Sequence, residues 1–163
     1  MVKSSPGDLE GLVAAFVQGT LPASAWTHEA HLRVGLWHVR RHGPEAALPL
    51  LRARIRAYNE ARGTANTPTS GYHETITRFY VWLIAGFLRK APPDADADAL
   101  ADALIAAHGH RGLPLDYWSD DALFSTAARV GWVPPDVRAL EWPDAPAPPP
   151  RAAAPNPPTP PAP

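Results

Sequence analysis

The stretch from Val81 to Leu88 constrains the fold more than any other part of the chain, because it contains no polar side chain. It lies inside a segment of helical spacing that runs from about Gly71 to Lys90. A helix that is apolar on every face has to be covered by other elements. The apolar run is also far shorter than the ~20 residues that cross a membrane, so no membrane partner is expected. The sequence therefore predicts a domain packed around a buried helix over 71–90.

Five further helical segments are predicted from apolar spacing and from residues that start or stop helices. They cover 8–19, 27–42, the residues from 44 to about 60, 94–108 and a broken stretch over 116–132. Four starts have a side chain suited to an N-cap, namely Asp8, Thr27, Ser119 and Ser125. No strand-like alternation occurs, so no strand is predicted. The expected fold is all-α, an irregular bundle of five or six helices.

The last part of the 163-residue chain differs in composition from the rest. From Pro143 onward, 11 of 21 residues are proline and most of the others are alanine. Such a segment has no large apolar side chains with which to form a core, so disorder is expected. The predicted division is a helical domain over 1–142 and a disordered Pro/Ala-rich tail over 143–163.

Charge and cysteine content narrow the range of partners. Lys and Arg number 15 against 16 Asp and Glu, and no basic patch dominates, so a nucleic-acid partner is not expected. The absence of cysteine excludes disulfides and thiolate ligands, so a transition-metal site would have to use histidine and carboxylate. The first residues show no signal-peptide pattern, which favours a soluble, cytoplasmic protein. The oligomeric state is left open.

Two short motifs contain the side chains best suited to bind a metal. His28 and His31 lie three residues apart at the start of the second predicted helix, about one turn apart along it. His73 and Glu74 stand side by side at the start of the fourth. Helix starts can meet at one end of a bundle, so the four side chains are predicted to hold one divalent metal ion, zinc or iron.

Each motif also has a simpler explanation. His28 could merely sit at a helix start, and His31 could be a hydrogen-bonded histidine of the core. Glu74 has Arg78 four residues later, in the order that favours a helical ion pair. Alternatively, Glu74 could stand off the metal as a general base for bound water. The sequence leaves these alternatives open.

The remaining polar residues are given other roles. His38 and His42 continue the stripe of His31 but are left out of the predicted site. His108 and His110 are predicted to cap the end of a helix. The arginines at positions 52, 54 and 56 are expected to face water.

Three blocks of sequence resemble those of a family of small bacterial proteins. They read W-T-H-x-x-H-L near the start, N-T-P-x-x-G-Y-H-E-T-I-T in the middle and S-x-x-A-R-x-x-x-V-P-P-D over 125–136. The likeness covers most of residues 16–136. No activity is settled for this family, so the resemblance implies a shared set of polar residues and no reaction. It implies Thr77 and Arg129 as lesser candidates beside the four predicted ligands.

The predicted function is a metal-dependent enzyme that acts on a small molecule. The ion would polarise a substrate oxygen or lower the pKa of bound water, and Glu74 would move the proton if it is not a ligand. Water activation with zinc needs fewer assumptions than oxygen activation with iron. Trp26, Tyr72 and Tyr80 could wall the pocket, although aromatic residues at helical spacing are more often part of the core. The alternatives are a module that binds or senses a metal or ligand without turnover, and a hydrogen-bonded polar cluster without metal.

Overall fold

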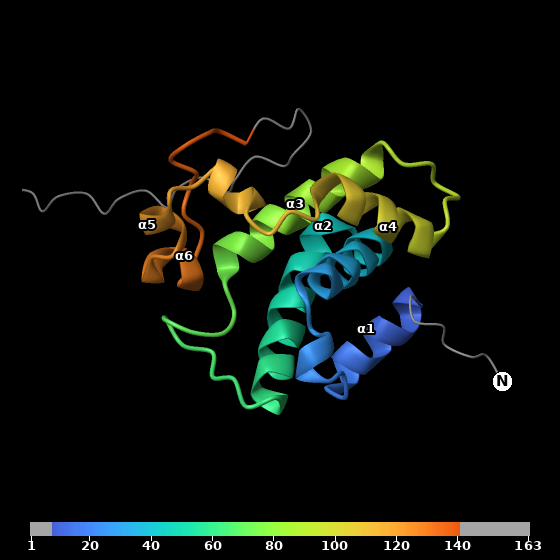
Figure 1. Ribbon diagram of the computed structural model, residues 1–163, viewed down its shortest axis with the longest axis horizontal. Coiled ribbons are helices and arrows are strands. Elements are labelled where there is room, and N and C mark those ends of the chain that lie inside the picture. Colours follow the sequence, from blue (N-terminus) through green and yellow to red (C-terminus); the bar gives the residue numbers. More distant parts are fainter. Residues whose placement is uncertain (1–7, 141–163) are drawn as a thin grey trace, which may run out of the picture.

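The computed structural model describes residues 8–140 (Figure 1). In order, its helices are α1 (Leu9–Gln18), the 3-10 helix η1 (Ala23–Ala25), α2 (His28–Ala61), α3 (Glu74–Arg89), α4 (Ala97–His108), η2 (Leu113–Asp116), α5 (Asp120–Leu123) and α6 (Thr126–Val130). Within these residues no β-strand occurs, and one isolated bridge joins Thr67 and Ser70. The predicted all-α fold is therefore confirmed. The predicted tail over 143–163 lies outside the described residues.

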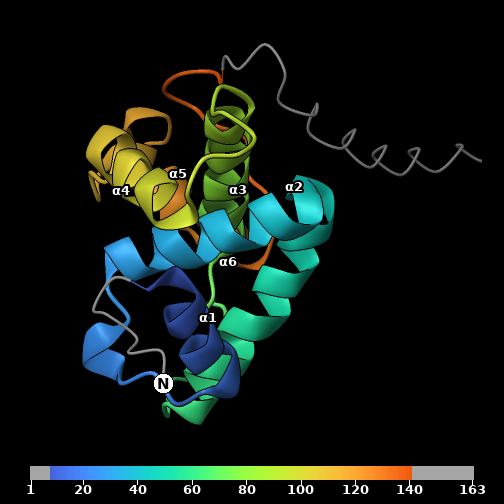
Figure 2. The ribbon, with the colours of Figure 1, turned by 90° about the vertical axis from the view of Figure 1, so that its right-hand side faces the viewer.

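Helix α3 is the buried helix that the apolar run predicts. All residues from Val81 to Ala85 are buried, which places every face of this part of the helix against other elements. The main partner of α3 is α2, and α6 packs near its N-terminal end. Figure 2 shows the first half of α2 crossing α3, with α1 in the angle between the two halves of α2. No helix of residues 8–140 is both long and apolar enough to span a membrane.

A sharp bend divides α2 into the two helices that the sequence predicts. At the bend, Gly43 has φ +79° and ψ 161°, a conformation that only glycine adopts readily. Pro44 follows it at the first position of the second half, where its missing amide hydrogen is no loss. The bend turns the second half of α2 away from the direction of the first half (Figure 2).

The helix starts follow the predicted caps with small shifts. Thr27 Oγ1 accepts a hydrogen bond from Ala30 N at 3.2 Å, and Asp8, Ser119 and Ser125 cap their helices in the same way. The helix predicted from residue 71 begins instead at Glu74, because the side chain of His73 forms its cap. The stretch predicted over 116–132 contains two short helices, α5 and α6, and begins at the last residue of η2.

The C-terminal segment is held on α3 by a second, smaller core. Phe79 and Leu83 of α3 pack with the buried Trp118 and Leu123. Thr75 Oγ1 also donates to Gly131 O at 2.8 Å. These contacts place the segment around α6 beside the N-terminal end of α3.

Candidate functional site

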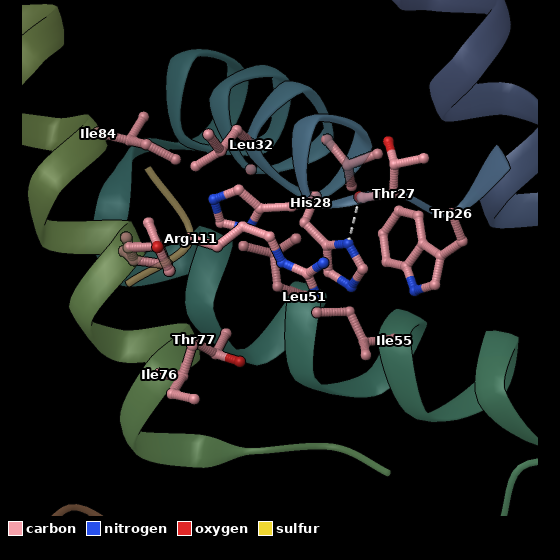
Figure 3. A pocket seen from close by; sticks show the side chains of 15 residues that line it. Trp26, Thr27, His28, Leu32, Leu51, Ile55, Ile76, Thr77, Ile84 and Arg111 are labelled. Carbon is pink, nitrogen blue, oxygen red and sulfur yellow. Dashed lines mark hydrogen bonds between the residues drawn. The ribbon is translucent and has the colours of Figure 1, made fainter. Parts of the chain in front are cut away.

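A pocket of about 470 Å³ lies between the two halves of α2 and α3 (Figure 3). Its walls come from residues of 26–35, 51–55 and 76–84, together with Arg111 from the loop after α4. Most of these side chains are apolar. Leu32, Leu51 and Ile84 are examples from three walls. The polar groups that do enter the pocket therefore decide its chemistry.

His31 stands on the pocket wall in a fixed orientation. Its Nδ1 donates a hydrogen bond to Thr27 O at 2.7 Å, and its ring lies 3.7 Å from that of Trp26, centroid to centroid. His31 is exposed on its pocket side, yet the protein atoms packed around its ring lower its pKa below the usual value, against the raising effect of the Thr27 carbonyl. The exposed surface of the His31 side chain forms part of the pocket wall. At neutral pH the ring is uncharged, so Nε2 offers a lone pair.

His28 and Tyr80 form a second polar feature of the same pocket. Their rings lie 5.7 Å apart, edge to face. Burial lowers the pKa of His28 and raises that of Tyr80 to about 12. His28 Nε2 and the Tyr80 hydroxyl are buried, and neither has a hydrogen-bond partner among the described residues. Both side chains are therefore neutral, and a ligand would reach these shielded atoms only if the two rings turned toward the pocket.

Arg111 brings a positive charge to the pocket. Figure 3 shows its side chain extending into the space beside His28. The charge also lowers the pKa values of His28 and His31, after the larger effect of burial. The polar end of the pocket therefore favours a negatively charged or hydrogen-bond-accepting group.

His73 lies outside this pocket, and both nitrogens of its ring have partners. Nδ1 accepts from Ile76 N at 3.2 Å, and Nε2 donates to Leu123 O at 2.8 Å. Burial lowers its pKa. The ring is thus a neutral helix cap that also ties α3 to the end of α5.

Glu74 lies in another cleft and is paired with Arg52. Arg52 donates two hydrogen bonds to the carboxylate, one of them from Nε to Oε2 at 3.0 Å. Tyr72 donates a third, from its hydroxyl at 2.6 Å. Burial alone would raise the pKa of Glu74, but these hydrogen bonds outweigh it and leave the pKa below its usual value. Arg78, the partner indicated by helical spacing, lies instead over the ring of Trp132.

The predicted ligands are therefore divided between separate places. The pocket brings His28 and His31 together, whereas His73 and Glu74 have other contacts. Within residues 8–140, no group of three or more His, Asp or Glu side chains is placed to hold a metal ion. The four-residue metal site stays a prediction. Of the lesser candidates, Thr77 lines the pocket and Arg129 lines the other cleft.

The second cleft, which contains Glu74, has a volume of about 510 Å³. It lies next to the pocket, on the other side of the contact between α2 and α3. Leu51 and Ile55 of α2 line the pocket, while their neighbours Arg52 and Arg56 line the cleft. Thr77 and Arg78 of α3 are divided in the same way. The contact between α2 and α3 therefore separates the two cavities.

Two side chains that line these cavities could not be identified from the sequence. Arg52 is expected to face water but is half-buried against Glu74, since α2 and α3 pack together. Arg111 is not singled out because it belongs to a loop, where no periodicity indicates the direction of a side chain. Trp26 and Tyr80 line the pocket beside α3, whereas Tyr72 lines the second cleft.

Comparisons with models of protein families, with curated proteins and with solved structures found no match to this chain.

Proposed function

We propose that the pocket beside α3 binds a small molecule that has an apolar body and an anionic head group, such as a carboxylate. The observation that carries the proposal is the pair of buried, unpartnered polar atoms, His28 Nε2 and the Tyr80 hydroxyl. A buried polar group without a partner costs about 1–3 kcal/mol. A ligand that turns these two rings toward the pocket and forms both hydrogen bonds would remove this cost.

The dimensions and lining of the pocket support the same ligand class. Its volume of about 470 Å³ falls within the range of about 300–1,000 Å³ that is usual for small-molecule sites. Leu32, Ile55 and Ile84 offer apolar contacts for the body. The guanidinium of Arg111 and the hydroxyl of Tyr80 are donors, and Arg111 supplies the charge that a carboxylate needs. The proposed location of the protein is the cytoplasm.

The experiment compares matched carboxylates and amides by ligand-observed NMR. Phenylacetate and indole-3-acetate are expected to bind more tightly than phenylacetamide and indole-3-acetamide, since only the acids have a charge for Arg111. Arg111→Gln should weaken phenylacetate binding by about tenfold, the effect of one charge-assisted hydrogen bond. Arg138→Gln is the matched control, because Arg138 is exposed and lies over Tyr117. Equal binding of acids and amides, or no binding of either, would contradict the proposal.

The metal-dependent enzyme is a second candidate, supported by the orientation of His31. Its Nδ1 donates to Thr27 O, which leaves Nε2 as the nitrogen free to bind an ion, the usual arrangement of a metal-bound histidine. His28 offers a second nitrogen in the same pocket. A zinc or iron ion held there would supply a Lewis acid, while Glu74 could take part only after leaving Arg52. Metal analysis of untagged protein tests this candidate, with about one ion per chain expected and none after His31→Ala.

A further inference from the structure

The second cleft has an unusual concentration of positive charge. Arg52 and Arg56 reach it from α2, Arg78 from α3 and Arg129 from α6. Among the described residues that line it, Glu74 is the one acid. Glu74 is paired with Arg52 and also attracts Arg78, so a single carboxylate faces four guanidinium groups on the cleft walls.

Two of these arginines, Arg78 and Arg129, are each held in place by a contact with an uncharged group. Arg129 Nη1 donates to Gly71 O at 2.7 Å. The guanidinium of Arg78 lies 5.4 Å from the ring centroid of Trp132. Neither a carbonyl nor an indole cancels a full positive charge. The cleft walls therefore have an excess of positive charge, which an anion bound there would balance.

We propose that this cleft binds a small molecule through a phosphate or diphosphate group. A guanidinium presents its donors as a planar fork that matches phosphate oxygens. Arginines from three different helices can each contact a different oxygen of one phosphate, whereas a carboxylate has only two oxygens. A phosphate monoester also has a charge of about −1.5 to −2 at neutral pH, which suits the excess of positive charge. The cleft lies at the N-terminal end of α3, whose dipole adds to the attraction.

The volume of about 510 Å³ has room for more than the phosphate itself. The site is distinct from the pocket beside α3, so this proposal does not depend on the proposed function. Ligands for the two sites can be tested separately on the same protein.

Isothermal titration of the full chain with pyrophosphate, in a low-salt buffer free of phosphate, tests the proposal. We expect a dissociation constant of about 1 mM or lower, which weakens as salt is added. Arg56→Gln and Arg78→Gln should each weaken binding by about tenfold. Arg41→Gln is the matched control, because Arg41 lies over Trp37 at 5.2 Å as Arg78 lies over Trp132. Arg129 is not used, since its loss would also release the loop at Gly71.

A variant that gains affinity guards against effects of misfolding. Glu74→Gln removes the negative charge from the cleft and frees Arg52, so pyrophosphate should bind about threefold or more tightly. Citrate, which has a similar charge but no phosphate, should bind more weakly than pyrophosphate. Absence of pyrophosphate binding, an equal loss in Arg41→Gln, or weaker binding by Glu74→Gln would overturn the site. Citrate binding as tight as that of pyrophosphate would overturn the assignment to phosphate.

Discussion

Replacing Glu74 by glutamine should destabilise the fold by about 1–3 kcal/mol at neutral pH. The carboxylate is 8% exposed and accepts hydrogen bonds from Arg52 and Tyr72. Breaking a buried ion pair costs about 3–5 kcal/mol when the remaining charge stays buried. Arg52, however, keeps 41% of its side chain exposed and can be hydrated, and glutamine still offers an oxygen to Tyr72. The expected loss is therefore closer to the ~1.5–3 kcal/mol of hydrogen bonds to charged groups.

The loss should depend on pH, because only the ionised carboxylate stabilises the fold in this way. The pKa of Glu74 is lower in the folded protein than its usual value of 4.5. Near and below that value the unfolded chain binds the proton more readily, so the contribution is complete above about pH 5 and disappears as pH falls through the folded-state pKa. The free energies of unfolding of wild type and Glu74→Gln should therefore converge on acidification.

Urea unfolding at about pH 7, 6, 5 and 4, followed by circular dichroism, measures this difference. The buffers should contain no phosphate, since an anion bound in the cleft would add its own stabilisation. Asp102→Asn is the control, because Asp102 pairs with Arg33 at 2.6 Å but is 70% exposed, and its loss should cost below about 1 kcal/mol. A difference for Glu74→Gln that stays constant with pH, or is no larger than that of the control, would refute the reasoning.

Three further predictions concern single side chains. His38 is fully buried, and burial lowers its pKa to about 4. The free energy of unfolding should therefore fall by up to about 3 kcal/mol as pH drops from about 6.5 to 4. The free energy of unfolding of His38→Gln should depend less on pH. Tyr80→Phe removes a buried hydroxyl without a partner in residues 8–140, so the ligand-free protein should gain about 0–1 kcal/mol in thermal unfolding. Leu83→Ala should cost about 2–5 kcal/mol, against about 0.5 kcal/mol or less for the 65% exposed Val130→Ala, and similar losses would contradict the burial of α3.

Interactions that are local along the chain could be predicted from the sequence. The caps of Thr27, Ser119 and Ser125 bind amides only three residues away, so their position relative to an apolar pattern is sufficient. Pro44 and Gly43 likewise indicate the bend of α2 through their own backbone preferences. The burial of α3 on every face over 81–85 follows from composition alone, although the apolar residues 86–88 are only partly buried.

The candidate site depends on contacts between residues that are far apart in the sequence, so patterns within one segment do not predict them. Glu74 has a plausible partner in Arg78 four residues later, but its partner in the structure is 22 positions earlier on a different helix. His73 is predicted as a ligand but caps α3 in the structure, and its contact with Leu123 O joins residues 50 positions apart. The grouping of His28 with His31 needs only helical spacing, whereas the meeting of both with Arg111 and Tyr80 needs the packing of the whole bundle.

The contact between α2 and α3 forms a wall that the two cavities share, so binding in one cavity can affect binding in the other. Neighbouring residues face opposite sides of it, as Ile55 and Arg56 do, so a ligand that changes the spacing of the two helices on one side changes it on the other. Any such effect must be reciprocal. If a carboxylate in the pocket tightens pyrophosphate binding by about fivefold, pyrophosphate must tighten carboxylate binding by the same factor. Two titrations, each with the other cavity saturated, would measure one coupling free energy twice.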